Sequence, residues 1–314
     1  MKWLFRNQLG RISYSPIEFS IARFGFALVL VHSIWSLAKA NDETSLDEPH
    51  GLAWLGNGPE GELSWLGDLT VWFSAGPGVP TAWFLVFAVL LAFYLINFAP
   101  IFTSFGLLTI HTLAGTFYMS QGAMHHTQQI ISLVLFGQLL ASIWNAIKLR
   151  RSDSLLWPSS QVFRDSSMFL CQQMIAASYV ITGLTKFEKS KGHWIEDSPN
   201  LVVQFDKNLQ MDFYNHLQPP DERMTQWMTN FLTNYPSLGM IIFGSALLLE
   251  FLAFFALFNR SIMALWGLAL IAMHLSIGVI MKLDFFYNEM VLLIFFVNIP
   301  FWIRAAGCRF LKTA

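Results

Sequence analysis

The sequence predicts an all-α polytopic membrane protein with about eight transmembrane helices and an amphipathic helix on the outer face. Only 12% of the 314 residues are charged, about half of the roughly 25% that is usual in soluble domains. Apolar runs long enough to cross a bilayer, about 20 residues each, recur from one end of the chain to the other. Because these runs occupy the whole chain, we expect a single membrane domain over residues 1–314.

Eight apolar runs are expected to form the transmembrane helices. They are Ile17–Trp35, Pro80–Asn97, Ile101–Tyr118, Gln129–Ala146, Ser167–Thr185, Leu238–Phe258, Ile262–Lys282 and Met290–Ile303. The first run has no small-residue cleavage site of the kind that follows a signal peptide, so it is expected to stay as a helix. Only three residues separate the second run from the third, which predicts a tight hairpin.

The distribution of charge predicts the orientation. Lys148, Arg150 and Arg151 fall between the fourth and fifth runs, whereas acidic residues concentrate in two loops, 38–79 and 186–236. Because cytoplasmic loops are enriched in Lys and Arg, the acid-rich loops are expected outside and both termini in the cytoplasm. The expected location is a bacterial cytoplasmic (inner) membrane, with the active face outward.

The second outer loop contains an apolar stripe with helical spacing. It recurs at intervals of three and four residues and consists of Met224, Trp227, Met228, Phe231, Leu232 and Tyr235. This pattern predicts an amphipathic helix over residues 221–235. We expect the helix to lie along the outer membrane surface.

Ionisable groups inside the expected helices are costly and call for an explanation, and four of them stand out. Arg23 either extends its side chain to the inner interface or has a functional role. His111 is expected to hydrogen-bond a neighbouring helix. Glu250 and His274 are expected at similar depth on adjacent antiparallel helices, where they either pair structurally or take part in catalysis.

A lysine, Lys186, follows the expected fifth helix on the outer side. A lysine in this place usually anchors a helix end in the headgroup region. A lysine that is partly buried in apolar surroundings loses its proton more easily and can act as a base near neutral pH. The residues by themselves leave both interpretations open.

Two adjacent histidines, His125 and His126, precede the expected fourth helix on the same outer side. A zinc site in a protein uses three or four side-chain ligands, and no third ligand stands at a suitable spacing. We therefore predict no metal site.

Several of these residues belong to segments that occur in one order along the chain. The segments are Ala22–Gly25, His126–Thr127, Tyr179–Phe187 with Trp194, and the stretches around Glu250 and His274. They resemble the HTTM membrane domain, which is shared with vitamin K-dependent gamma-glutamyl carboxylase, in a bacterial-type form without the large lumenal domain. The resemblance extends over about residues 17–301.

The resemblance implies an enzyme whose catalytic residues are Lys186 and His126. It also implies a set of residues that bind the substrate or quinone, namely His125, Tyr179, Trp194, Glu250 and His274. In that family the lysine deprotonates a reduced quinone of the vitamin K hydroquinone or menaquinol type. With O2 and CO2 as co-substrates, this drives carboxylation of a peptide, a reaction of the carbon–carbon lyase class. The implied partners are membrane lipid, the lipid-soluble quinone and a secreted peptide, with no nucleic acid.

The sequence departs from the family pattern at several positions. Thr185 replaces the first of two paired lysines, His125 replaces an asparagine, and Lys189–Gly192 are inserted before Trp194. Two other functions therefore stay open. One is a non-enzymatic membrane factor for maturation, export or immunity of a secreted peptide. The other is a proton-coupled transporter that uses Glu250 and His274.

Overall fold

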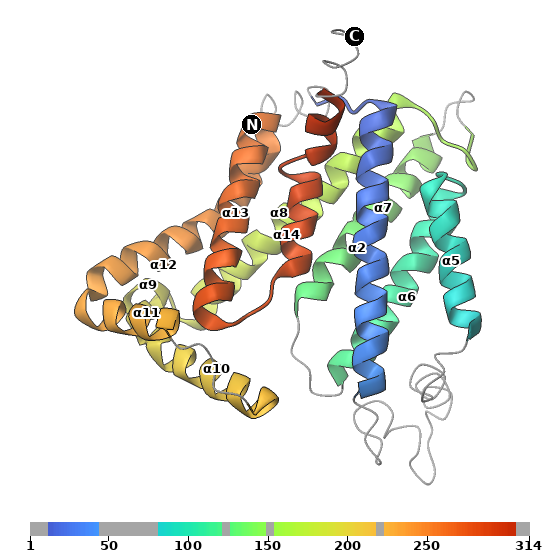
Figure 1. The fold of residues 1–314 in the computed structure, drawn as a ribbon. Coiled ribbons are helices and arrows are strands. Elements are labelled where there is room, and N and C mark those ends of the chain that lie inside the picture. Colours follow the sequence, from blue (N-terminus) through green and yellow to red (C-terminus); the bar gives the residue numbers. More distant parts are fainter. Residues whose placement is uncertain (1–11, 44–80, 121–125, 149–153, 218–222, 306–314) are drawn as a thin grey trace, which may run out of the picture. The chain divides into compact units, whose positions relative to one another are not determined.

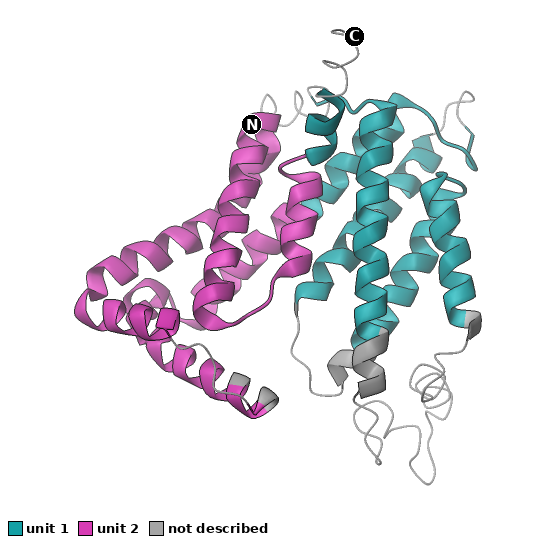
Figure 2. Cartoon of the chain, viewed as in Figure 1, with its two compact units in different colours: residues 1–174, 299–314 teal, residues 175–298 magenta. Residues whose placement is uncertain are grey.

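The structure is a computed structural model that describes residues 12–43, 81–120, 126–148, 154–217 and 223–305 (Figure 1). Within these ranges every regular element is a helix and no strand occurs. The chain forms two compact units, residues 1–174 with 299–314 and residues 175–298 (Figure 2). Most of the expected outer loop 38–79 and His125 lie outside the described residues.

The described part of unit 1 consists of helices, which include the short helix Ile299–Ala305 near the C-terminus and the longer elements that follow in chain order. They are α2 (Pro16–Glu43), α5 (Thr81–Leu95), α6 (Pro100–Ser120), α7 (Gln129–Lys148) and the N-terminal part of α8 (Gln161–Lys189), with a 3-10 turn, η1 (His126–Gln128), before α7. Helix α6 packs against α7, α5 and α2, and α2 also packs against α5. Helix α6 is therefore the central element among these contacts.

The tight hairpin expected between the second and third runs is confirmed. Helix α5 ends at Leu95 and α6 begins at Pro100. The turn uses two left-handed residues, Asn97 with φ 58° and Ala99 with φ 43°. Asn97 is a residue type that tolerates this conformation, and its side chain donates a 2.7 Å hydrogen bond to the carbonyl of Pro158.

The interpretation that Arg23 extends to the membrane interface is wrong. Its side chain is buried, with 5% of its surface exposed. The guanidinium donates to the backbone carbonyl of Tyr94 and lies 3.9 Å from the centroid of the Tyr94 ring. Burial of a cation requires such compensation, so Arg23 fixes α2 against the end of α5.

The expectation that His111 bonds neighbouring helices is confirmed. Its Nδ1 lies 2.8 Å from the hydroxyl of Ser132 in α7. Its Nε2 lies 2.8 Å from the hydroxyl of Ser33 in α2. His111 thus connects the three helices α2, α6 and α7 through one imidazole.

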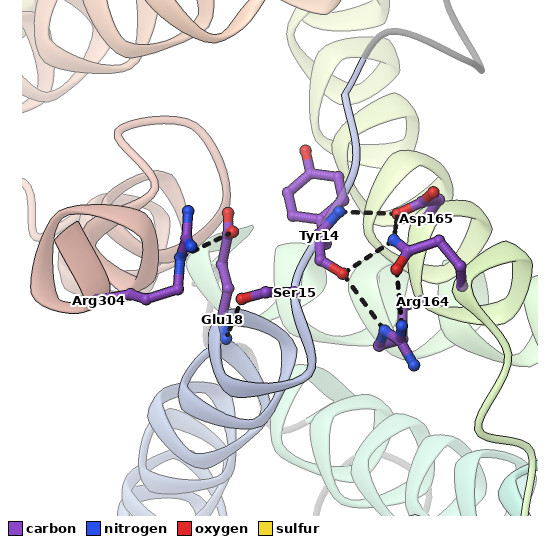
Figure 3. Close-up of polar contacts among 7 residues, drawn as sticks. Tyr14, Ser15, Glu18, Arg164, Asp165 and Arg304 are labelled. Atoms are coloured by element: carbon purple, nitrogen blue, oxygen red, sulfur yellow. Dashed lines mark hydrogen bonds and ion pairs between the residues drawn. The ribbon is translucent and has the colours of Figure 1, made fainter. Parts of the chain in front are cut away.

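A polar cluster holds Tyr14, two residues before α2, against the start of α8 (Figure 3). The backbone N–H of Tyr14 donates to Asp165 at 2.8 Å, and its carbonyl accepts from Gln161 at 2.9 Å and from Arg164 at 3.3 Å. The Tyr14 hydroxyl accepts a 2.7 Å hydrogen bond from Gln172. The first three of these bonds satisfy the backbone N–H and carbonyl of Tyr14, which would otherwise be buried without partners.

A second polar contact in Figure 3 joins α2 to the C-terminal segment of unit 1. Glu18 is fully buried, and its Oε2 lies 3.8 Å from Nε of Arg304. The backbone N–H of Glu18 donates to the Ser15 hydroxyl at 3.2 Å, which caps the first turn of α2.

Unit 2 contains the second half of α8 and a series of shorter helices. They are α9 (Trp194–Asp197), η2 (Ser198–Asn200), α10 (Leu201–His216), α11 (Arg223–Asn234), α12 (Pro236–Phe251), η3 (Ala253–Phe258), α13 (Arg260–Met281) and α14 (Phe286–Phe295). Phe205, Met228 and Leu232 form a buried core between α10 and α11. Thr225 and Asn208 donate to the carbonyls of Ile280 and Met281, which leaves fewer unpaired carbonyls at the end of α13.

The helix expected at Leu238–Phe258 breaks in the structure. Helix α12 ends at Phe251, and a 3-10 helix follows. At this point the Leu249 carbonyl accepts a 3.0 Å hydrogen bond from the indole of Trp266 in α13. A side-chain donor inserted at a helix end in this way is a recognised cause of a break.

The helix expected over residues 221–235 is present as α11. Met228 and Leu232 are buried on its inner side, whereas Met224, Trp227 and Tyr235 are more than half exposed. Part of the predicted apolar stripe therefore packs inside unit 2, and the rest faces outward.

Four described helices are long and apolar enough to cross a membrane: Pro16–Leu37 of α2, then α7, α8 and α13. The number rises to six if α11 with α12, and α14 with the helical residues after it, each count as one span. Apolar side chains on the outside of these helices, such as Leu265 and Leu268 of α13, are more than half exposed. Extended apolar surface of this kind is unfavourable in water, so the helices indicate an integral membrane protein.

The close packing of α7 on α8 gives a first prediction. A Cβ atom at Gly137 would lie 3.0 Å from the backbone oxygen of Leu170, and one at Gly115 would meet nothing within 4 Å. We expect Gly137→Leu to destabilise the protein by about 1–3 kcal/mol through overpacking, because a backbone atom cannot move aside. Gly115→Leu should not, and melting of both variants in detergent measures the difference. Equal melting temperatures would contradict the contact between α7 and α8.

Candidate active site

The ion pair between Lys186 and Glu250 is the centre of the candidate site in unit 2. The ammonium nitrogen of Lys186 lies 2.6 Å and 2.8 Å from the two carboxylate oxygens of Glu250. The Glu250 side chain is 5% exposed and the Lys186 side chain 32% exposed. The carboxylate is therefore the inner partner, and the lysine connects it to the surface.

Lys186 lies inside a helix, whereas the sequence analysis placed it after one. Helix α8 continues to Lys189 and ends where Lys191 and Gly192 adopt left-handed φ values of 54° and 88°. The Gly192 N–H donates to the Phe187 carbonyl at 2.9 Å. A glycine with positive φ commonly ends a helix in this way, so the residues inserted before Trp194 form the helix-ending turn.

A close approach of α8 to α12 brings the two charges together. Gly183 lies one helical turn before Lys186, on the same face of α8. A Cβ atom at position 183 would lie 3.3 Å from the backbone nitrogen of Phe251 and 3.4 Å from Cβ of Glu250. The glycine therefore lets the backbones come close enough for Lys186 to reach both oxygens of Glu250.

The chain after α8 turns back and covers the lysine with an indole. The Trp194 ring centroid lies 5.6 Å from the Lys186 nitrogen, within the range of a cation–π interaction. Trp194 is the first residue of α9. The lysine is thus held between a carboxylate on one side and an aromatic face on another.

An exposed ion pair beside Trp194 supports this turn. The Nδ1 atom of His193 lies 2.8 Å from Oε2 of Glu196. The hydrogen bond and the negative charge of Glu196 raise the pKa of His193 above its usual value. The pKa of His193 is higher in the folded protein than in the unfolded chain. The pair therefore stabilises the folded turn when His193 is protonated, and this contribution is lost as the pH rises through the pKa of the folded state.

Tyr179 and His274 form a second contact in unit 2. The Tyr179 hydroxyl lies 2.8 Å from Nε2 of His274, and the His274 ring stacks on Phe285 with centroids 4.5 Å apart. The sequence analysis considered a pair between Glu250 and His274. In the structure Glu250 instead bonds Lys186 of α8, and His274 bonds Tyr179 of the same helix.

A cavity of about 500 Å³ lies beside the lysine. Lys186 and Trp194 contribute to its wall, together with Phe243, Ile277 and Phe285. Among the described residues that line it, Lys186 is the only charged one. Two serines, Ser245 and Ser276, are also in the lining. A cavity of this size that is mostly apolar with a few polar groups is typical of a small-molecule site.

The structure brings together five of the expected site residues, Lys186, Glu250, Trp194, Tyr179 and His274, within unit 2. His126 begins η1 in unit 1, and its side chain is outside the description. The expectation that it shares a site with Lys186 stays a prediction. His125 also lies outside the described residues. No group of three or more potential metal ligands occurs in the described part of the chain.

The pairing of Lys186 with Glu250 was not predicted from the sequence. A signal was present, because Glu250 is the only acidic residue in the run Leu238–Phe258. A buried carboxylate needs a cation or hydrogen-bond donors, and a lysine at the end of a neighbouring helix is one source of both.

No family model, no curated protein and no solved structure matches the chain.

The pairing of Lys186 with Glu250 gives a second prediction. Glu250→Ala leaves the ammonium without its partner, and Lys186→Met leaves the carboxylate buried. We expect each single variant to lose on the order of 1–3 kcal/mol of stability. The double variant should lose less than the sum, because it removes both charges together. Melting of the four proteins in detergent measures the coupling, and strictly additive losses would show that the two groups do not interact.

Proposed function

We propose that the protein is a membrane enzyme that deprotonates a lipid-soluble hydroquinone at Lys186. The observation that carries the proposal is a cavity whose described lining is mostly apolar and has Lys186 as its one charged residue. A reduced quinone combines an apolar ring and chain with acidic hydroxyl groups, so it matches both parts of the site. The family resemblance of the segments around Lys186 points to the same substrate class.

The ion pair provides a path for the proton. Lys186 Nζ accepts a proton from the phenolic hydroxyl while it passes one of its own protons to the carboxylate of Glu250. The hydroxyl becomes a phenolate, Glu250 becomes neutral, and Lys186 stays an ammonium next to the new negative charge. Stabilisation of a developing anion by a fixed cation in apolar surroundings is a strong catalytic effect.

The downstream reaction in this proposal rests on the resemblance. It takes O2 and CO2 as co-substrates and a secreted peptide as the acceptor, which makes the chain a carboxylase-like enzyme. His126 is then a hydrogen-bond donor on the same outer face.

The enzyme proposal gives a third prediction. Purified protein in nanodiscs with menaquinol or vitamin K hydroquinone should consume oxygen faster than protein-free nanodiscs. Lys186→Met should abolish the difference, because methionine keeps the length of the side chain and removes the proton-transfer group. Lys189→Met is the matched control, since Lys189 is an exposed lysine one turn further along α8. Lys186→Met with undiminished oxygen consumption would overturn the assignment.

A non-enzymatic factor is the second candidate, and one observation favours it. The ammonium of Lys186 bonds both oxygens of Glu250, which is also the geometry of a purely structural clamp. An apolar replacement of both partners can preserve such a clamp. If Lys186→Met with Glu250→Leu folds and still supports maturation of the peptide, the pair is structural; loss of function in the folded double variant supports the enzyme.

We further propose that the chain has eight spans with both termini in the cytoplasm, and that α11 lies in the outer headgroup region. The outward side of α11 supports this placement. The rings of Trp227 and Phe231 are stacked with centroids 5.6 Å apart, and Tyr235 follows one turn later. Tryptophan and tyrosine are enriched at membrane interfaces.

The placement of α11 gives a fourth prediction. A nitroxide label on a cysteine at position 227 should be more accessible to O2 than to a water-soluble nickel complex, because O2 concentrates in lipid. A label at position 233, an exposed threonine on the polar side of α11, should show the reverse preference. Power-saturation EPR in nanodiscs measures both. The same preference at the two positions would contradict an interfacial α11.

A further inference from the structure

A second cavity, of about 670 Å³, lies in unit 1. Helix α6 and the start of α7 provide most of its wall. Leu113 and Phe136 line the cavity and are 38% and 41% exposed. The cavity therefore reaches the side of the helices, from which a molecule dissolved in lipid can enter.

A chain of hydrogen bonds crosses the wall of this cavity. The Thr112 hydroxyl donates to Ser132, and Ser132 bonds Nδ1 of His111 at 2.8 Å. The other ring nitrogen of His111 bonds Ser33, which donates to the side-chain carbonyl of Gln128.

The direction of these bonds fixes one end of the histidine. A serine hydroxyl has one proton, and that of Ser33 goes to Gln128. With the Gln128 amide in this orientation, the Ser33 oxygen is left to accept a hydrogen bond from Nε2–H of His111. The polar groups on the wall are thus already oriented by one another, and His111 and Gln128 are both more than 90% buried.

The rest of the described lining combines apolar side chains with three further polar ones, Thr109, Thr116 and Gln129. The described residues that line the cavity include no Asp, Glu, Lys or Arg. Burial of an ion without a partner is strongly unfavourable. The described lining therefore offers no charged partner to a charged head group, in contrast to the cavity beside Lys186.

We propose that this cavity binds an uncharged amphiphile with one hydrocarbon chain and a hydroxyl or carbonyl head, as in monoacylglycerols. The head lies against Thr112, Ser132 and Gln128. The Thr112 oxygen accepts from a head hydroxyl, and the amide of Gln128 brings N–H donors for a carbonyl. The chain lies along Leu108, Leu133 and Phe136. The volume is within the roughly 300–1,000 Å³ of small-molecule sites.

Gly115 offers a way to close the cavity without disturbing its wall. It lines the cavity, and a Cβ atom there would meet nothing within 4 Å. Leucine at this position occupies free space and also replaces a poor helix former. Gly115→Leu should therefore fold and block the ligand, whereas Gly115→Ala should fold and leave most of the space open.

The test uses a monoacylglycerol with a diazirine in its acyl chain, on purified protein in nanodiscs. After illumination, peptides that cover residues 107–116 and 129–136 should carry a saturable cross-link in the wild type and in Gly115→Ala. In Gly115→Leu this cross-link should fall to background. Leu133→Trp, which fills the same space from α7, should have the same effect and serves as the second blocking variant.

A fatty acid with the same diazirine chain tests the head group, because it differs only in its charged carboxylate. It should give no saturable cross-link in these peptides. Lys186→Met should leave monoacylglycerol labelling unchanged, which separates this site from the one beside Lys186. Equal labelling of the wild type, Gly115→Leu and Leu133→Trp, or equal labelling by the two probes, would show contact with surrounding lipid alone and overturn the proposal.

Discussion

The approach of α8 to α12 is the constraint on which the candidate site depends. Glu250 is almost completely buried, and a carboxylate in that position is unfavourable unless a cation reaches it. Lys186 reaches it because Gly183, on the same face of α8, leaves no side chain between the two helices. The same geometry leaves the lysine at the cavity wall. One small residue therefore determines both the stability of the pair and its access to a ligand.

The end of α8 matters for the same reason. The left-handed turn at Lys191 and Gly192 stops the helix and returns the chain so that Trp194 lies over the lysine. An earlier helix end would leave Lys186 in a loop, free to turn toward water. Because the helix extends beyond it, the side chain leaves α8 in a fixed direction, and about a third of it is exposed. A base with a fixed direction needs less reorganisation when a substrate arrives.

Local pattern predicted where several helices lie, but neither all of their ends nor their partners. The hairpin before Pro100 and the helix α11 followed from nearby residues, since turns and amphipathic stripes are encoded over short distances. The break after Phe251 depends on Trp266, which belongs to another helix. The burial of Arg23 depends on Tyr94. Such contacts join residues far apart in the sequence, and no periodicity reveals them.

Contacts between distant residues also explain why the sequence pointed to His274, and not to Lys186, as the partner of Glu250. A continuous helix over Leu238–Phe258 places Glu250 near its middle, at the depth of His274. Once α12 ends at Phe251, Glu250 becomes the next-to-last residue of its helix and meets the end of α8. The family resemblance identified the five residues that unit 2 brings together, yet it gave no pairing among them. The pairing required the helix ends, which depend on tertiary contacts.

The chemistry of the two cavities argues for function rather than stability as the reason for the ion pair. Replacing a buried ion pair by apolar residues is often neutral or even stabilising, so stability alone does not require Lys186 and Glu250. The described lining of the unit 1 cavity combines apolar and polar side chains and includes no Asp, Glu, Lys or Arg, so the described walls of the two cavities differ in charge. One cavity has a cation in its described lining and the other has none. This difference fits two different ligands. A molecule that gives up a proton needs the pair, whereas an uncharged amphiphile needs only oriented hydroxyl and amide groups.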